Sequence, residues 1–528
     1  MAELADSSAD HWCKVCNTDF SSRNRLFRHL RENPGCAKEG GFAAVAAEES
    51  ERVNAISETP APADPTPAWD PTAAAKKVTN ALHGEIFETR LRCKVKDRAE
   101  KKTAERKPPQ VETRAGSYKA ELQAKVQALE AFFVDGAGLA ASFVGLPPTE
   151  VFESPPEHFR MKAEFGIWNH DGGPSYAMSS GKSQIVVDRY PMGSRVMCDT
   201  LMPAVLEAIR AEELLRAHLF QVNFHTTLRG GSIVSLLYHT PYDRGSRRER
   251  NRIQAENRLA EAPTLEGDTK GPLTDDWEAA AVRLQAAIAI GDPAGASIVG
   301  RIHGMARVVG HDWVEEELEV VGVPKRLRYR QLGGFFCQPN AAVCQHMLAW
   351  ARAVCLADAA EIGTVVEASR EDDLLELYCG NGNFAVALAP CFRRVLATEL
   401  VKALVDTAKL NAEYNDATNV AFARVSAEEL AQAMQGTRVF ERMKHISLEE
   451  YRLNTVLVDP PRAGLGPEVC ALLAQFPRIV YISCNPETLR VDFEMLRETH
   501  DIQRMAAFDQ FPYTDHVEMG VLLVRRAT

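Results

Sequence analysis

The C-terminal half of the chain repeats one pattern, in which a short apolar run is followed by a turn and then by helix-forming sequence. Five such runs follow Gln331, and each is expected to be a strand: residues 373–378, 395–398, 455–458, 479–482 and 519–524. Strands that alternate with helices form a doubly wound, largely parallel sheet, which binds ligands beyond the carboxyl ends of its strands. The polar residues at those ends are therefore the first candidates for a functional site.

The first of these strands leads into a glycine-containing turn, Tyr-Cys-Gly-Asn-Gly-Asn, at residues 378–383. Glycines let the backbone turn tightly beneath a nucleoside, and Glu399, which ends the next strand, can accept hydrogen bonds from both ribose hydroxyls. This geometry would serve NAD or S-adenosylmethionine. A third glycine at dinucleotide spacing is missing, however, and Glu376 stands where a pyrophosphate would prefer bare amides. A cationic sulfonium ligand is the better fit, with a purely structural turn as the alternative.

Two later turns add an acid and a thiol. Asp459 precedes two prolines that stiffen the chain, so it either orients a ligand at a fixed edge of the sheet or merely caps the turn. Cys484 follows the next strand, and its thiol should face the same edge as Gly380 and Asp459. A buried cysteine is usually only a small hydrophobe. A thiolate here could instead add to C6 of a uracil and so make C5 nucleophilic enough to accept a methyl group.

A base must then remove the C5 proton before the cysteine can leave. The segment before the last strand offers two candidates, His516 and Glu518. Glu518 is favoured because burial among Phe511, Tyr513 and Met519 would raise its pKa toward the working range, although a solvated carboxylate is the simpler interpretation.

The motifs LLELYCGNGNF, VLATE, VDPPRAGL, YISCNPETL and FDQFPYTDHVEMGVLL resemble, in order and spacing, those of the bacterial TrmA-type tRNA (uracil-5-)-methyltransferases. The resemblance extends upstream through FRMKAEFGIW and FQVNFHTTL, and it spans roughly residues 117–528. It implies Cys484 as the nucleophile and Glu518 as the base. It also implies a set of side chains that bind S-adenosylmethionine: Gln338, Tyr378, Asn383, Glu399 and Asp459.

The resemblance implies transfer of a methyl group to C5 of the T-arm uridine of tRNA through a covalent adduct between cysteine and C6. The target base would have to be flipped out of its loop. Three alternatives remain: methylation of rRNA uridines, a dinucleotide-dependent oxidoreductase, and a catalytically silent RNA-binding adaptor. The glycine spacing disfavours the oxidoreductase, and the intact Cys484 and Glu518 disfavour the adaptor.

Composition shifts divide the chain into an N-terminal unit, a linker and two folded domains. We expect a Rossmann-like methyltransferase domain at residues 336–528 and an α+β RNA-binding domain at 116–335, with an insertion near 242–273. Residues 46–115 have the composition of a disordered, partly basic linker. In the RNA-binding domain the family-like segments contain Phe159, Arg160, Lys162 and Phe224, but aromatic residues in such strands are more often core than RNA contacts.

Residues 1–45 carry the spacing of half a zinc finger. The expected ligands are Cys13, Cys16, His29 and Cys36, with Phe20 and Leu26 as a small core. Zinc prefers four nitrogen or sulfur ligands, and so small a unit needs the metal to fold. Unligated cysteines in a disordered tail are the alternative.

The net charge of −11 argues against a general polyanion binder, so any RNA surface must be a local patch. The 12 scattered cysteines suit a reducing compartment. The chain contains no run of about twenty uncharged apolar residues and no secretory signal at its N-terminus. We therefore expect a soluble intracellular monomer without a membrane partner, in the cytoplasm or the nucleus, with an organelle not excluded.

Overall fold

The computed structural model describes residues 12–13, 18–19, 112–134, 145–170, 172–180, 183–239, 272–288, 295–302, 305–356 and 371–526. The chain separates into two units, Met1–Ala74 and Ala75–Thr528. In the first unit, β1 (Trp12–Cys13) pairs antiparallel with β2 (Thr18–Asp19). Cys16, His29 and Cys36 lie outside the described residues, and so do the linker up to residue 111 and the insertion as far as residue 271. Of Cys13 only the backbone is described.

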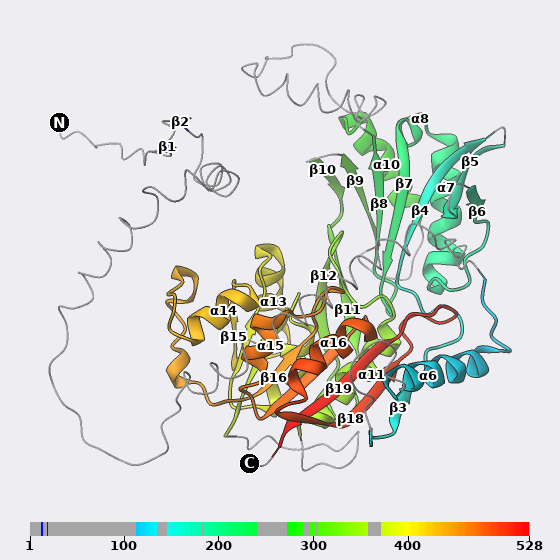
Figure 1. Ribbon diagram of the computed structural model, residues 1–528. Coiled ribbons are helices and arrows are strands. Elements are labelled where there is room, and N and C mark those ends of the chain that lie inside the picture. Colours follow the sequence, from blue (N-terminus) through cyan, green and yellow to red (C-terminus); the bar gives the residue numbers. More distant parts are fainter. Residues whose placement is uncertain are drawn as a thin grey trace, which may run out of the picture. The chain divides into compact units, whose positions relative to one another are not determined.

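The larger sheet of the second unit has eight strands in the order β15-β14-β13-β16-β17-β19-β18-β3 (Figure 1). The strands are β3 (Thr149–Phe152), β13 (Asp373–Leu377), β14 (Val395–Thr398), β15 (Val420–Ala423), β16 (Leu453–Val458), β17 (Arg478–Ser483), β18 (His500–Phe508) and β19 (Glu518–Arg525). The pairs from β15 to β17 are all parallel, whereas β19 runs antiparallel to both β17 and β18. The predicted doubly wound, largely parallel sheet is confirmed.

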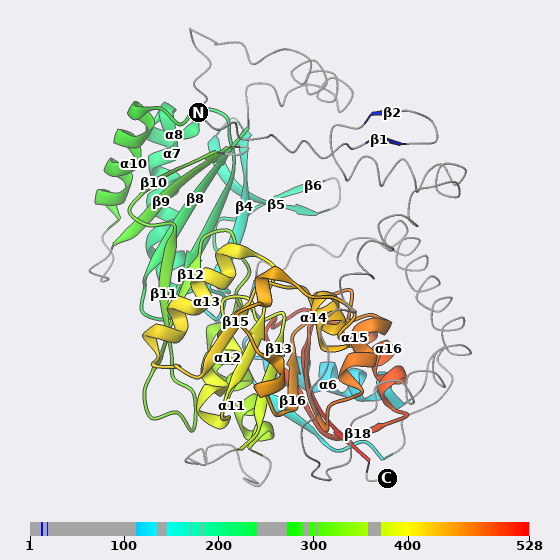
Figure 2. The same ribbon diagram turned by 90° about the vertical axis from the view of Figure 1, so that its left-hand side faces the viewer.

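Helices cover both faces of this sheet, as Figure 2 shows. One face packs against α11 (Ala341–Cys355), α12 (Asn383–Leu388) and α13 (Lys402–Tyr414), and the other against α14 (Ala427–Met434), α15 (Pro467–Leu473) and α16 (Pro486–Leu496). Side chains alternate across a strand, so Leu374 of β13 joins the first core while Leu375 and Leu377 join the second. A strand buried on both faces reads as a continuous apolar run, which explains the signal in the sequence.

The last strand of this sheet, β3, comes from near the start of the unit. It pairs in parallel with β18, from Met505↔Thr149 to Phe508↔Phe152. The preceding helix α6 (Tyr118–Val134) buries a stripe of apolar side chains in the same core: Tyr118, Leu122, Val126, Leu129 and Phe133. Both elements fall within residues 116–335, where the sequence predicts the RNA-binding domain. A four-residue strand carries too little periodicity to reveal a partner so distant along the chain.

The second large sheet has seven strands in the order β10-β9-β8-β7-β4-β5-β6. They are β4 (Lys162–His170), β5 (Gly173–Ser180), β6 (Ser183–Val186), β7 (Leu219–Thr226), β8 (Ser232–Tyr238), β9 (Ala296–Ile302) and β10 (Met305–Val309). Its apolar side chains share a core with α7 (Met202–Ala211), α8 (Glu213–Arg216) and α10 (Asp275–Ala287). A hairpin of β11 (Trp313–Leu318) and β12 (Leu327–Leu332) follows it in the chain.

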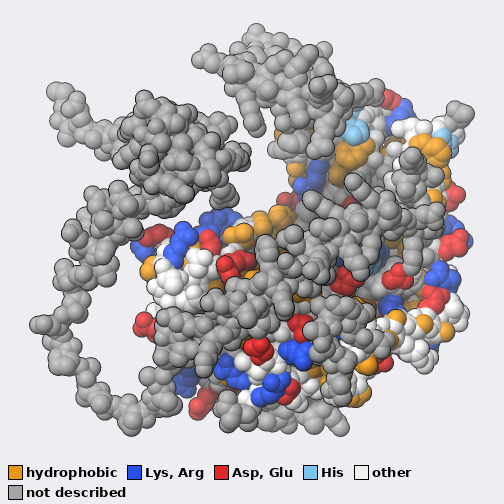
Figure 3. Space-filling model, viewed as in Figure 1, with side chains coloured by type: hydrophobic (Ala, Val, Ile, Leu, Met, Phe, Trp, Pro, Cys, Tyr) orange, Lys and Arg blue, Asp and Glu red, His pale blue; other side chains and the backbone are white. Residues whose placement is uncertain are grey.

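Acidic and basic side chains are interspersed on the face drawn in Figure 3, without a broad area of one sign. Among the ion pairs of the described residues are Arg328–Glu315 at 2.8 Å, across the β11–β12 hairpin, and Lys402–Asp406 at 2.6 Å, one turn apart on α13. Among the described helices, none has the length and apolar character that crossing a bilayer would require.

Candidate active site

The turns that carry the predicted site residues follow neighbouring strands of the larger sheet. The glycine loop follows β13, Asp459 follows β16 and Cys484 follows β17. These strands are adjacent and parallel, so their carboxyl ends meet at one edge. Because β19 runs in the opposite direction, its first residue, Glu518, starts at that edge. The fold thus brings together groups that are far apart in the sequence.

Cys484 and Glu518 occupy matching positions on two paired strands. The register of β17 and β19 ends at Ser483↔Met519, and one further step along it sets Cys484 opposite Glu518. On its other side Glu518 pairs with Phe508, and only 4% of Glu518 remains exposed. Cys484 is partly exposed and so is not simply a packed core residue. A thiol and a buried carboxyl group therefore lie at the same edge.

The electrostatics of this edge are dominated by carboxyl groups. Burial, and then the neighbouring Asp459, raises the pKa of Glu518 to about 8, which confirms the direction expected from the sequence. Burial raises the pKa of Asp459 to about 7. Burial followed by the charges of Glu518 and Asp459 raises the pKa of the Cys484 thiol to about 11. At neutral pH the Cys484 thiol and the Glu518 carboxyl group are therefore mainly protonated, whereas Asp459 is close to half ionised.

Arg462 supplies positive charge at the edge that carries Cys484 and Glu518. This residue was not among those predicted from the sequence. It opposes the rise in pKa of both Cys484 and Glu518. Its carbonyl oxygen accepts a hydrogen bond from Asn485 Nδ2 at 3.1 Å, which ties its loop to the turn that carries Cys484. The signal was present in the sequence, because Arg462 lies three residues after Asp459 in the motif VDPPRAGL.

The Arg462 side chain also distinguishes between the two candidate bases. Arg462 Nη2 lies 3.0 Å from His516 Nδ1, and a guanidinium can only donate, so Nδ1 accepts. His516 is exposed, and burial followed by the charge of Arg462 lowers its pKa. Its Nδ1 lone pair is therefore occupied, whereas Glu518 Oε2 is buried without a hydrogen-bond partner among the described residues.

Glu399 is held rigidly beside the glycine loop. Its Oε2 accepts from Gly380 N at 3.2 Å, and its Oε1 accepts from Leu400 N and Val401 N at 2.7 and 2.8 Å. Gly380 and Gly382 have φ values of 56° and 82°, which glycine adopts without the steric penalty of a Cβ atom. Tyr378 adopts φ 62° despite its side chain, and such strain is concentrated at functional sites.

Buried acceptors lie beside the loop. Gln338 Nε2 donates to Asp459 Oδ2 at 3.4 Å, but Gln338 Oε1 and Glu376 Oε2 have no hydrogen-bond partner among the described residues. Each such atom costs about 1–3 kcal/mol unless a ligand or water satisfies it. Asn383 begins α12, and its Nδ2 lies 3.4 Å from Cys344 Sγ. The unsatisfied acceptors fit a ligand that carries hydrogen-bond donors, and an acid that nearby positive charge would ionise, Asp459, fits a cationic one.

Two of the four side chains considered for RNA contact belong to the core. Phe159 and Phe224 are 2% and 1% exposed, so the core interpretation holds for both. Arg160 donates to the carbonyl of Lys162 at 2.7 Å, and Lys162 Nζ donates to the carbonyl of Phe335 at 2.6 Å. Both cations are thus anchored to backbone close to Gln338.

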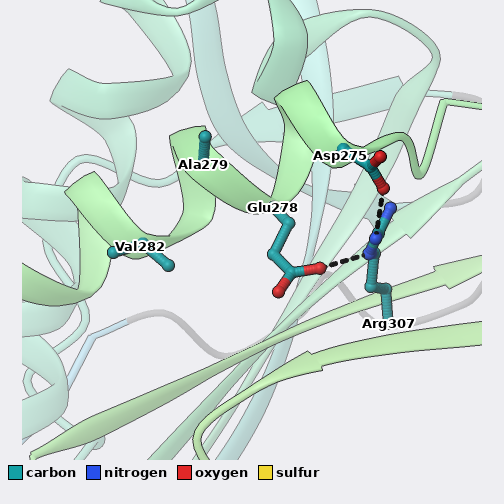
Figure 4. Close-up of a pocket in the computed structure, with 5 residues that line it drawn as sticks. All are labelled: Asp275, Glu278, Ala279, Val282 and Arg307. Carbon is teal, nitrogen blue, oxygen red and sulfur yellow. Dashed lines mark hydrogen bonds and ion pairs between the residues drawn. The ribbon is translucent and has the colours of Figure 1, made fainter.

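A separate hollow lies on the seven-stranded sheet, between α10 and β10 (Figure 4). Its lining includes Arg307, which donates to Asp275 and Glu278 at 2.6 Å each. Arg307 is thus paired with both acids of the hollow, and no predicted site residue lines it. Within the described residues, no group of three or more His, Cys, Asp or Glu side chains is arranged to hold a metal ion.

A family model described as tRNA (Uracil-5-)-methyltransferase matches residues 117–262 and 269–526. The chain belongs to this family. Within the insertion predicted near residues 242–273, the match leaves out only residues 263–268. Membership removes the oxidoreductase alternative, which the glycine spacing already disfavoured.

Bacterial relatives of the tRNA (uracil-5-)-methyltransferase family match most of the chain. The tRNA/tmRNA (uracil-C(5))-methyltransferase of Ectopseudomonas mendocina is 43% identical over 413 residues, which cover 78% of this chain and 98% of the relative. The enzyme of the same name from Azotobacter vinelandii is 44% identical over 393 residues, which cover 74% and 94%. The family model begins at residue 117, after the predicted finger and linker.

A solved structure supports the fold. The Pyrococcus abyssi tRNA (uracil-54, C5)-methyltransferase in complex with S-adenosyl-L-homocysteine matches with a TM-score of 0.51 at 20% identity, over 77% of this chain and 83% of that one. The predicted methyltransferase fold is therefore confirmed for the larger sheet and its helices.

Proposed function

We propose that the chain transfers a methyl group from S-adenosylmethionine to C5 of a uridine in tRNA, and that the target is the T-arm uridine that becomes ribothymidine. Family membership supports the reaction class. The observation that carries the assignment of residues is the strand register that sets Cys484 opposite Glu518, beside Asp459 and the glycine loop.

In the proposed mechanism Cys484 loses its thiol proton to water and the resulting thiolate attacks C6 of the flipped uracil, which makes C5 nucleophilic. S-adenosylmethionine would supply the electrophilic methyl group that C5 accepts, and S-adenosylhomocysteine would be the leaving group. Glu518 then takes the C5 proton, the C5–C6 double bond reforms and the Cys484 sulfur leaves as a thiolate. Glu518 suits this step because it is buried and its Oε2 has no competing partner among the described residues.

The proposed cofactor residues each have a task that their geometry supports. Glu399, held by three backbone donors, is positioned to accept from ribose hydroxyls, while Tyr378 and Asn383 flank the loop beneath the nucleoside. Gln338 and Asp459 join across the edge, where the charge of a bound sulfonium would favour the ionised form of Asp459. The positive charge of a bound sulfonium would lower the pKa of Cys484, whose main neighbours are carboxyl groups.

We assign the seven-stranded sheet to RNA binding and expect a monomer to act on the tRNA. Anchored cations such as Arg160 and Lys162 lie on the chain segment that joins this sheet to the site. With a net charge of −11, binding should depend on such local contacts and on the folded shape of the arm.

The reaction class is tested with tRNA whose uridines carry tritium at C5. Because each turnover removes the C5 hydrogen, the full-length protein with S-adenosylmethionine should release tritium to water in step with methyl incorporation. Undermodified tRNA is the expected substrate, and tRNA with the T-arm uridine replaced by cytidine is the matched control. Release from rRNA fragments but not from tRNA would contradict the proposed substrate, and no release would contradict the reaction.

We also propose that Cys13, Cys16, His29 and Cys36 bind one zinc ion. Elemental analysis of the full-length protein should give about one zinc per chain, and a Cys13→Ala, Cys16→Ala variant should lose it because two of four ligands are gone. Zinc content that this variant leaves unchanged would contradict the ligand set. Methylation by the variant would show whether the finger assists the reaction.

A further inference from the structure

The loop between β18 and β19 delivers the proposed base, and it is held from outside the sheet. It runs from Asp509 to Val517, and the pair Phe508↔Glu518 closes it. Any shift of this loop would move the Glu518 carboxyl group, because Glu518 is the first residue after it. The contacts that fix this loop therefore affect how Glu518 removes the proton.

Lys125 of α6 contacts both limbs of this loop. Its Nζ donates to Asp509 Oδ1 at 2.6 Å and to the carbonyl of Phe511 at 3.1 Å on the entering limb. It also donates to the carbonyl of His516 at 3.1 Å on the returning limb, two residues before Glu518. An ammonium group has three N–H donors, and these three contacts use all of them. α6 passes beside this loop in Figure 1.

The setting makes these contacts strong. The Lys125 side chain is 11% exposed and that of Asp509 is 1% exposed, so water competes little for either group. Asp509 N also donates to the carbonyl of Phe152 in β3, which fixes the entering limb to the sheet. α6 itself is anchored by its buried apolar stripe. Lys125 thus links helix α6 to both limbs of the loop between β18 and β19.

We propose that Lys125 is a positioning residue for the base: it clips the two limbs of the loop together and so holds the Glu518 carboxyl group at the distance that proton removal requires. This rests on the proposed function and deepens it. Loss of the clip should impair elimination, in which Glu518 takes the C5 proton and the Cys484 sulfur leaves, more than the earlier attack and methyl transfer. A displacement of about 1 Å can slow such a step roughly 100-fold.

The test is a single-turnover reaction with methyl-labelled S-adenosylmethionine and unmodified tRNA, which separates labelled protein–RNA adduct from free labelled RNA on denaturing gels. With Lys125→Met, adduct should accumulate and free methylated RNA should appear roughly 10- to 100-fold more slowly, while label enters RNA at nearly the wild-type rate. Lys119→Met is the matched control, because Lys119 lies on the same helix with a side chain 82% exposed. It should behave like the wild type.

A second variant guards against a folding defect. Asp509→Asn keeps the shape of the side chain but removes the charge that Lys125 binds, and it should slow elimination in the same direction by a smaller factor. The proposed role of Lys125 would be contradicted if Lys125→Met and Asp509→Asn slowed methyl transfer to RNA and elimination equally. It would also be contradicted if neither variant slowed elimination. If the wild type and Lys119→Met give no labelled RNA, the proposed function itself fails and the inference with it.

Discussion

Replacing Cys484 with alanine is expected to abolish both the covalent protein–RNA adduct and turnover. Alanine has no nucleophile, and C5 of an unactivated uracil is too weak to accept a methyl group. The loss should exceed 10³-fold on the order-of-magnitude scale of a missing catalytic nucleophile. The measurements are tritium release from C5 and the yield of adduct that survives denaturation. S-Adenosylmethionine should still bind, because the residues proposed to hold it are unchanged.

Cys198→Ala is the matched control for this experiment. Cys198 is the other partly exposed cysteine among the described residues, and it lies in η1 (Val196–Leu201), beside the seven-stranded sheet. Its thiol donates to the carbonyl of Tyr190 at 2.7 Å, so its replacement should cost some stability but no chemistry. Full adduct yield with Cys484→Ala, or loss of adduct with Cys198→Ala, would refute the assignment of the nucleophile.

Replacing Glu518 with glutamine is expected to stop the reaction after methyl transfer. The amide keeps the size of the side chain but cannot take up the C5 proton, so methylated adduct should accumulate while tritium release falls roughly 10²- to 10⁴-fold. His516→Gln provides the comparison, because the sequence left both residues as candidates. It should retain elimination. If methylated adduct accumulated with His516→Gln while tritium release stayed normal with Glu518→Gln, His516 and not Glu518 would be the base.

The pH dependence of elimination gives an independent test of the same residue. Burial raises the pKa of Glu518 to about 8, so at neutral pH the carboxyl group is largely protonated. Only the ionised form can accept a proton, and the rate of elimination in the wild type should therefore rise with pH and level off above about 8. The residual rate of Glu518→Gln should lack this rise. A wild-type rate that falls through this range would contradict Glu518 as the base.

Parts of the fold could be predicted because they leave local patterns in the sequence. β13, β16 and β17 are buried on both faces over most of their length, so they appear as mainly apolar runs, interrupted in β13 by Glu376, and glycine or proline turns follow them. The pairing of β3 with β18 and the hydrogen bonds from Lys125 to the loop before Glu518 leave no such pattern. Each depends on contacts between residues more than 350 positions apart, such as Lys125 with Asp509, and no periodicity encodes such a partner.

The sequence by itself determined which chemical groups stand at strand ends: the Cys484 thiol, the Asp459 and Glu518 carboxyl groups, and the glycine turn before Asn383. It did so because strand, turn and side-chain type are local properties. Only the tertiary structure decided how these groups affect one another. Burial and the charges of neighbouring carboxyl groups raise the pKa values of Cys484 and Glu518. Arg462 donates a hydrogen bond to His516 Nδ1. These interactions depend on distances through space, which the pairing of the strands creates.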